Sequence, residues 1–181
     1  MRCILLLVLT LSLASTAPTR NNLKDDLRKA IEEPYLLLRR QNVWAGIQIS
    51  QKVIDTQRIK QEYIASWQTF HDKLTYVNET WAENGPKLGY VLNEVIGLQP
   101  TTRSRIDMNY YTNGAFDVIE SKNLELKTPI FAEFETKAKE IIRVYREAGY
   151  TNKDIDLYFN NFVQNPNENF DELLRYLYDD L

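Results

Sequence analysis

Residues 59–81 read IKQEYIASWQTFHDKLTYVNETW, and their apolar side chains recur at every third or fourth position. The members of this stripe are Ile59, Tyr63, Trp67, Phe70, Leu74, Val77 and Trp81. At about 100° of rotation per residue, they fall within an arc of about 80° on a helical wheel. A stripe of this kind is typical of the buried face of an amphipathic helix. The stretch therefore predicts a helical fold with both tryptophans in its core.

The residues before this stripe extend the helical pattern toward the N-terminus. Between Val43 and Asn84 there is no proline, and the one glycine is Gly46, which predicts a helix or kinked pair of up to about 42 residues. The apolar face changes within this length, however. Ile49 and Val53 share the face of Trp67, whereas Val43, Trp44, Ile47 and Ile54 point largely the other way. We therefore expect a bend near DTQR, residues 55–58.

A further helix is predicted near the N-terminus, beginning at Asn21 or Asn22. Both residues are good helix caps, and Asp25 and Asp26 follow in the first turn, where the helix dipole favours negative charge. The apolar stripe of this helix consists of Leu23, Leu27 and Ile31. Pro34 interrupts the pattern, so we expect it either to kink this helix or to begin a new one.

The middle of the chain contains clear helix stop signals. NGP, residues 84–86, predicts the end of one helix and the start of the next. That next helix carries the apolar residues Leu88, Val91, Leu92, Val95 and Ile96, and it stops at Gly97. A less regular helix is predicted over residues 103–121, although Gly114 lies within it.

The C-terminal third predicts three helices. Thr128 and Pro129 have the form of a cap and a first-turn proline, so we expect a helix to begin there and to end at Gly149. Its stripe consists of Ile130, Phe131, Phe134, Ala138, Ile141, Ile142 and Tyr145. Thr151 and Asp154 resemble a capping box that opens a short helix. A turn at QNPNEN, residues 164–169, then leads into a last helix. Together these patterns predict an all-α bundle of about six to eight amphipathic helices, with one helix long or kinked.

The first residues predict a signal peptide. A basic residue, Arg2, precedes the apolar run CILLLVLTLSL and the small residues ASTA. We expect residues 1–17 to be removed, with cleavage after Ala14 as an alternative. Residues 18–181 would then form a single helical domain that is secreted and extracellular. This domain would contain no cysteine, because Cys3 is the only one in the chain, so a disulfide framework is not expected.

Charge and hydropathy exclude several classes of partner. The formal net charge is −3, and basic residues occur only in pairs such as Arg39 and Arg40. Neither feature favours binding to nucleic acid. After the signal peptide, no apolar run approaches the roughly 20 residues that span a bilayer. We therefore expect no nucleic acid as a partner and no integral membrane segment.

Residues for catalysis or metal binding are scarce. His71 is the only histidine, so we expect no enzyme activity, no cofactor and no metal site. Oxygen-bearing side chains alternate at Asn165, Asn167, Asn169 and Asp171, as in a calcium loop. The loop pattern fails at its glycine position, which is Phe170, and at its glutamate position, which is Tyr176. This segment is better interpreted as a turn and a helix cap.

Several large side chains lie off the predicted stripes. They are Tyr76, Tyr110, Tyr111, Leu157 and Tyr176. Exposed tyrosines supply rigid, amphipathic area for protein recognition, although off-stripe residues can equally contact a neighbouring helix. Our leading hypothesis is a non-enzymatic protein that binds an extracellular partner protein through these side chains.

Two other functions remain open at this stage. The first is a carrier that encloses a lipid or another small apolar ligand between its helices. The residues predicted to line such a site are Tyr63, Trp67, Phe70, Trp81, Phe131 and Phe134. The second is a hydrolase that uses paired carboxylates, for which the sequence offers no placed pair.

Asn78, Glu79 and Thr80 form the only N-x-S/T sequon in the chain, which predicts a glycoprotein modified at Asn78. Asn78 lies about 65° from the centre of the apolar stripe, and His71 about 85° on the same side. Ile64 continues this flank at a spacing of seven residues. A glycan on Asn78 would place the flank in water and would make His71 a poor candidate for a buried catalyst.

Overall fold

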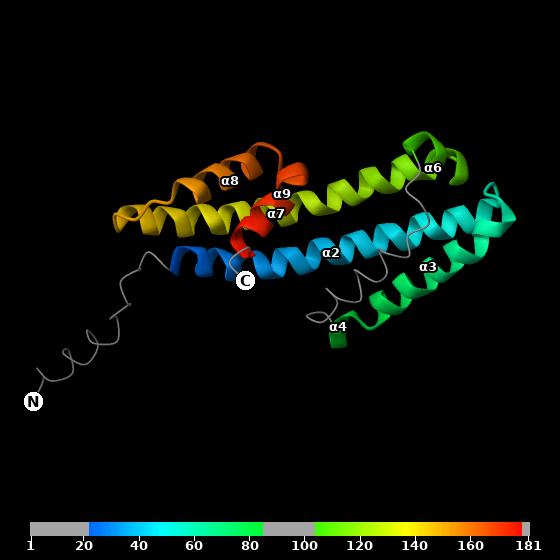
Figure 1. Cartoon of the computed structure of the whole chain (residues 1–181), viewed down its shortest axis with the longest axis horizontal. Coiled ribbons are helices and arrows are strands. Elements are labelled where there is room, and N and C mark those ends of the chain that lie inside the picture. Colours follow the sequence, from blue (N-terminus) through cyan, green and yellow to red (C-terminus); the bar gives the residue numbers. More distant parts are fainter. Residues whose placement is uncertain (1–21, 85–103, 179–181) are drawn as a thin grey trace, which may run out of the picture. The chain divides into compact units, whose positions relative to one another are not determined.

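The structure is a computed structural model that describes residues 22–84 and 104–178 (Figure 1). These residues form helices and no strand, which confirms the all-α fold. The helices of the described residues are α2 (Asn22–Thr56), α3 (Gln61–Glu79), α4 (Trp81–Asn84), α6 (Arg105–Tyr111), α7 (Ala115–Glu147), α8 (Lys153–Gln164) and α9 (Pro166–Tyr178). The predicted signal peptide and the helix predicted after Pro86 lie outside the described residues.

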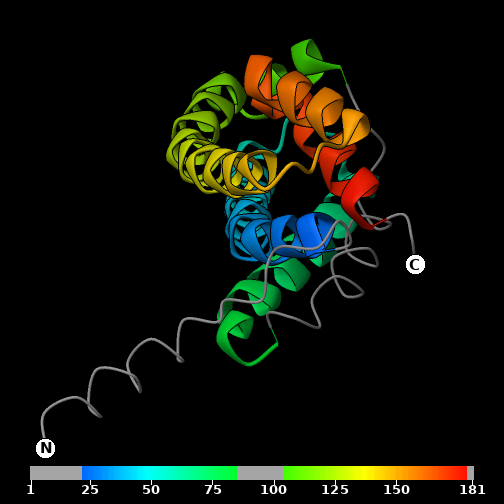
Figure 2. The same cartoon turned by 90° about the vertical axis from the view of Figure 1, so that its left-hand side faces the viewer.

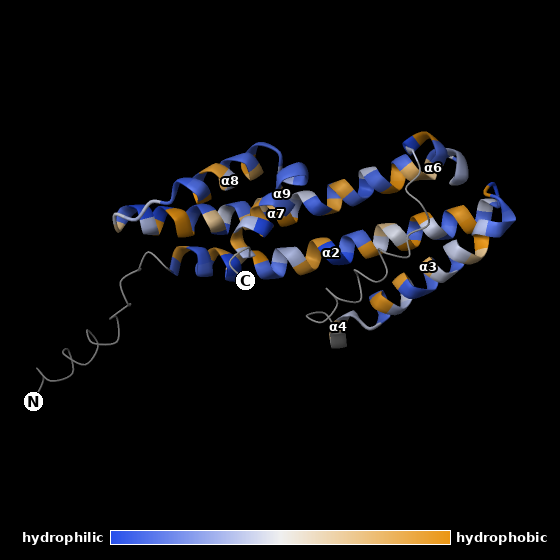
Figure 3. Ribbon diagram, viewed as in Figure 1, coloured by the Kyte–Doolittle hydropathy of each residue, from blue (hydrophilic) through white to orange (hydrophobic). Residues whose placement is uncertain are grey.

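The chain divides into two compact units. Unit 1 consists of Met1–Glu32 and Glu133–Leu181, and unit 2 of Glu33–Ala132. Helices α2 and α7 each contribute residues to both units. Along the helices, hydrophobic residues recur among hydrophilic ones, as expected for amphipathic elements (Figure 3).

Helix α2 continues through Pro34, so the prediction of an interruption there is wrong. A proline inside a helix removes one backbone hydrogen bond and costs roughly 3 kcal/mol. Pro34 itself is buried, as are Ile31 before it and Leu38 after it. Burial of these side chains offsets the cost of the proline, and the helix reaches 35 residues.

The predicted bend at residues 55–58 is confirmed. Helix α2 ends at Thr56, and Gln57 adopts a positive φ of 50°, which an α-helix does not allow. Helix α3 begins at Gln61 and carries the buried stripe of Trp67, Phe70, Leu74 and Val77. The break therefore falls in the expected segment, although the residues assigned to the other apolar face lie in α2 together with Ile49 and Val53.

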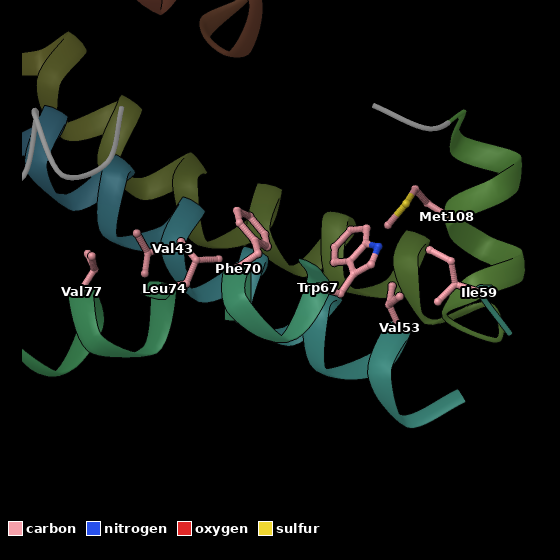
Figure 4. Packing of buried hydrophobic residues seen from close by; sticks show 8 residues of the cluster. All are labelled: Val43, Val53, Ile59, Trp67, Phe70, Leu74, Val77 and Met108. Atoms are coloured by element: carbon pink, nitrogen blue, oxygen red, sulfur yellow. The ribbon is translucent and has the colours of Figure 1, made fainter. Parts of the chain in front are cut away.

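Unit 2 has its core between α2 and α3, with one residue from α6 (Figure 4). The buried side chains are Val43, Val53, Ile59, Trp67, Phe70, Leu74, Val77 and Met108. Val43 was expected on another face and is instead part of this cluster, and Ile47 and Ile54, expected on the same face as Val43, pack against it, so this part of the prediction is wrong. In Figure 4 the indole of Trp67 lies near the end of the cluster that includes Met108 and Ile59. This packing holds α3 against α2.

The single helix predicted over residues 103–121 is wrong, because α6 and α7 are separate. Asn113 and Gly114 between them have positive φ values of 56° and 81°. This conformation suits asparagine and glycine and ends a right-handed helix. Helix α7 begins at Ala115, where a new run of helical hydrogen bonds starts.

The start predicted for α7 at Thr128 is also wrong, because Pro129 lies inside the helix. Instead of capping a helix, the Thr128 hydroxyl donates a hydrogen bond to the Leu124 carbonyl, at 3.0 Å. Phe131 and Phe134 are both buried, which offsets the backbone bond lost at the proline. The helix ends at Glu147, before Gly149 with its φ of 85°, as the sequence predicts.

In unit 1, α8 and α9 lie side by side (Figures 1 and 2). The cap of α8 is Asn152, whose Oδ1 accepts from the backbone N–H groups of Asp154 and Ile155, so the predicted capping box at Thr151 is wrong. The side chain of Asn169 in α9 donates to the carbonyls of Asn161 and Asn165, at 3.0 and 3.1 Å. These bonds satisfy carbonyls at the end of α8 and fix the turn between the helices.

Candidate partner-binding surface

Helix α6 presents two large apolar side chains to solvent. Ile106 is 82% exposed and Tyr110 is 60% exposed. They lie four residues apart and so occupy one face of the helix, whereas Met108, between them in sequence, is 8% exposed and belongs to the core of unit 2. The inward methionine therefore orients an outward apolar face.

The ends of α6 are fixed by hydrogen bonds. Ser104 caps the helix by accepting from the Asp107 N–H, at 3.2 Å. At the other end, the buried Thr112 hydroxyl donates to the Met108 carbonyl at 2.8 Å and accepts from the Phe116 N–H at 2.9 Å. Both ends of this short helix are therefore held in one conformation.

The turn after α2 supports α6 from its C-terminal end. The Thr56 hydroxyl donates to the Tyr111 carbonyl, and Arg58 Nη1 donates to the Tyr110 carbonyl at 3.2 Å. The Arg58 guanidinium also lies 5.4 Å from the centroid of the Tyr110 ring, a cation–π distance. Arg58, Ile106 and Tyr110 together form what we call the α6 surface.

An ion pair next to the α6 surface joins α6 to α7. Arg105 Nε and Asp117 Oδ1 lie 2.7 Å apart. The pKa of Asp117 is lowered, mainly by a hydrogen bond with Asn109 and further by Arg105. Asp117 therefore remains ionised to lower pH than an isolated aspartate, and its charge stays available to Arg105.

Two predicted contact residues of unit 2 differ in environment. Tyr76 on α3 is 61% exposed. Tyr111 is half-buried and packs against the core of unit 2, with its ring 5.7 Å from that of Tyr110 in an edge-to-face arrangement. As expected for consecutive helical residues, only one of the two adjacent tyrosines points inward.

The predicted contact residues of unit 1 also divide. Leu157 is 56% exposed, whereas Tyr176 is half-buried. The Tyr176 ring stacks on Tyr158 at 4.6 Å, and Lys24 Nζ lies 4.8 Å from its centroid. Tyr176 thus contacts neighbouring helices, the alternative that the sequence left open. Tyr158, Glu172, Arg175 and Tyr176 also line an open hollow of about 260 Å³.

Of the six side chains predicted to line an apolar ligand site, Trp67, Phe70 and Phe134 pack against other rings. Trp67, Phe70, Phe131 and Phe134 are buried, and Tyr63 and Trp81 are partly exposed. Trp67 and Phe70 meet edge to face at 6.0 Å, and Phe134 meets Phe162 at 5.3 Å. Ring contacts of this kind are typical of a packed core.

His71 takes part in a link between α3 and α2. Its Nδ1 lies 3.1 Å from the hydroxyl of Ser50, which is fully buried and donates to the Gly46 carbonyl at 2.7 Å. The Ser50 hydroxyl also lies 3.0 Å from the Ile47 carbonyl, and His71 Nε2 lies 3.5 Å from the Thr75 hydroxyl, so both ring nitrogens have polar neighbours. The contact between Ser50 and His71 thus links α3 to α2.

The flank of α3 that includes Asn78 borders α2. At His71 this flank faces α2, and Ile64 packs against the core of unit 2. Asn78 lies in the last turn of α3 and is half-exposed.

In residues 22–84 and 104–178, no group of three or more His, Cys, Asp and Glu side chains is placed to hold a metal ion. Over the same ranges, no helix combines the length and the apolar character needed to cross a membrane.

Sequence reasoning identified Tyr110 but missed Arg58 and Ile106. Ile106 and Tyr110 are separated by four residues with Met108 opposite, a pattern that could have indicated one outward apolar face. It was missed because residues 103–121 were interpreted as one continuous helix. Arg58 lies in the bend, where helical periodicity places no side chain.

Comparisons of the chain with protein-family models, with curated proteins and with solved structures found no significant match.

Proposed function

We propose that this protein is a secreted, non-enzymatic helical protein that binds a partner protein outside the cell through the α6 surface. The observation that carries the proposal is the 82% exposure of Ile106 on a helix whose opposite side is anchored in the core. Burial of an exposed aliphatic side chain against a partner is favourable by about 25 cal/mol per Å² of apolar surface removed from water.

The composition of the α6 surface supports this proposal. Tyrosine and arginine are enriched among the residues that dominate binding energy at protein interfaces, and here the Arg58 guanidinium is stacked on Tyr110. The hydrogen bonds at both ends of α6 hold its backbone in place. Ordering of this surface would therefore cost little free energy on binding.

Secretion and modification at Asn78 belong to the same proposal. They are supported by the basic, apolar and small-residue segments of residues 1–17 and by the sequon. The non-enzymatic part is supported by the residue content, since the chain has a single histidine and its one cysteine lies in the predicted signal peptide.

Affinity capture from the extracellular fluid of the source organism tests the proposal, with three immobilised proteins. They are the wild type, the double variant Ile106→Asp/Tyr110→Ala, and the matched variant Leu157→Asp, which places the same charge on an exposed leucine of unit 1. We expect a partner that wild type and Leu157→Asp retain and that the double variant loses by about tenfold or more.

Equal melting temperatures would show that all three proteins are folded. Capture that does not depend on Ile106 and Tyr110 would contradict the proposal. Loss with Leu157→Asp alone would instead place the binding surface on α8.

The carrier hypothesis stays a prediction, and the ring contacts within the helical cores make it the weaker one. Native mass spectrometry of the secreted protein tests it directly. A carrier would retain a ligand whose mass adds to that of the polypeptide and would release it to a fluorescent fatty-acid competitor.

A further inference from the structure

The sequon occupies the C-terminal turn of α3. Asn78 is in the helix, and Thr80 is the residue that caps its end, with φ −93° and ψ 9°. Residues two apart on a helix point to opposite sides, so the side chains of Asn78 and Thr80 diverge in the folded protein. A transferring enzyme recognises both side chains at once, because the motif requires the asparagine and the hydroxyl together.

The Thr80 hydroxyl is already engaged in the folded protein. It donates to the Tyr76 carbonyl at 2.8 Å, and the Thr80 N–H bonds the same carbonyl at 3.0 Å. Val77, next to Asn78, is buried against α2, which keeps this turn closed. Presentation of the sequon in an extended form would require both bonds to Tyr76 to break and the last turn to open.

The amide of Asn78 is placed differently from the hydroxyl of Thr80. It is half-exposed, and its side chain makes no hydrogen bond to any residue of ranges 22–84 and 104–178. Conversion of one amide N–H into a bond to a sugar therefore sacrifices no internal hydrogen bond among these residues. A glycan on Asn78 is therefore compatible with the folded helix, whereas transfer of the glycan requires the last turn of the helix to be open.

We infer that the glycan is attached to Asn78 before the last turn of α3 forms, so that glycosylation competes with the packing of α3 onto α2. In the reaction, Asn78 Nδ2 forms a bond to C1 of a sugar activated as a polyprenyl diphosphate. The bond between C1 and the diphosphate oxygen breaks, the diphosphate leaves, and one amide proton is released. This inference rests on the proposed secretion, because the donor is available only to exported chains.

The first measurement is the intact mass of the full chain produced in animal cells, before and after treatment with an N-glycan amidase. We expect the mass of wild type and of Thr80→Ser to fall on treatment. Asn78→Gln and Thr80→Ala should carry no glycan. A wild-type mass that does not change on treatment would overturn the inference, whether the chain is found in the medium or in the cells.

The second measurement tests the order of events. Unglycosylated full chain made in bacteria is incubated with purified oligosaccharyltransferase and a lipid-linked oligosaccharide. Wild type is compared with Trp67→Ala/Leu74→Ala, which removes two side chains that hold α3 in the core. We expect the double variant to be modified at least about tenfold faster, because its last turn is open more of the time.

Equal rates for the two chains would overturn the inferred order even if Asn78 carries a glycan in cells. Phe134→Ala/Leu173→Ala, which removes buried side chains of unit 1, controls for general destabilisation. Its rate should stay closer to that of wild type, and a rate equal to that of Trp67→Ala/Leu74→Ala would also overturn the inference. Neither measurement depends on partner capture, so failure of the binding proposal would leave this result intact.

Discussion

Tyr145 allows a sharp test of how unit 1 is stabilised. The side chain is buried, and its hydroxyl donates a hydrogen bond to Asp26 Oδ2 at 2.8 Å. This bond joins α7 to the first turns of α2, which are far apart in the sequence. Tyr145→Phe removes the hydroxyl and leaves the ring in place, including its edge contact with Tyr150 at 6.5 Å.

The expected cost of Tyr145→Phe follows from the type of bond. A hydrogen bond to a charged group contributes about 1.5–3 kcal/mol to stability, and the retained ring leaves no large cavity. We therefore expect the free energy of unfolding at pH 7 to fall by about 2 kcal/mol. Urea denaturation followed by circular dichroism would measure this difference.

The pH dependence provides an independent check. Burial raises the pKa of Tyr145 to about 12, and the neighbouring Asp26 carboxylate adds to this rise. An unfolded tyrosine ionises near pH 10, so the folded state holds this proton more tightly. The stability contribution is fully present below pH 10 and is lost between about pH 10 and 12. Tyr145→Phe lacks this loss.

The stability difference between wild type and Tyr145→Phe should therefore shrink by about 2 kcal/mol as the pH rises from 9 to 12. Comparison with the variant cancels the ionisation of the other tyrosines. A variant as stable as wild type at pH 7, with the same pH profile, would refute the reasoning. Asp26→Asn, which keeps an acceptor but removes the charge, should lower stability by less than Tyr145→Phe does.

Three further predictions concern packing and helix ends. Trp67→Ala should cost about 3–5 kcal/mol of unfolding free energy, and Trp67→Phe clearly less, since the buried Nε1 has no hydrogen-bond partner among the described residues. Gly46→Ala should lower the free energy of unfolding by about 1 kcal/mol in urea denaturation, because the added Cβ would lie 2.7 Å from Leu74 Cδ1. In the Leu74→Ala background the same change should be stabilising, because alanine has the higher helix propensity. Arg28→Ala removes the bond from Arg28 Nε to the Leu177 carbonyl, so hydrogen exchange should accelerate in α9.

The parts of the fold that the sequence predicted well depend on long apolar stripes. Trp67, Phe70, Leu74 and Val77 recur at helical spacing, and all four are buried in α3. The end of α2 was predicted within DTQR, and Gln57 breaks the helix in that segment with its positive φ. A long apolar stripe is a strong signal because many side chains must lie on the same face of the helix.

The prolines show where local reasoning failed. Pro34 and Pro129 were each expected to limit a helix, and both lie inside one. A proline costs a helix a fixed amount, whereas the gain from continuing depends on what the next turns bury. Leu38 follows Pro34 and Phe134 follows Pro129, and both are buried. The sequence around each proline does not show which other helices will bury these side chains.

The candidate surface was only partly predictable for a related reason. Two adjacent tyrosines on a helix cannot both point inward, but the sequence does not say which one does. In the structure Met108 and Tyr111 pack toward the core. The positive φ of Gly114 separates α6 from α7, so the apolar face of α6 does not have to match that of α7. With that register fixed, Ile106 and Tyr110 are directed outward. A variant such as Met108→Lys should therefore disturb the α6 surface without altering any of its residues, and should weaken partner capture as strongly as Ile106→Asp/Tyr110→Ala.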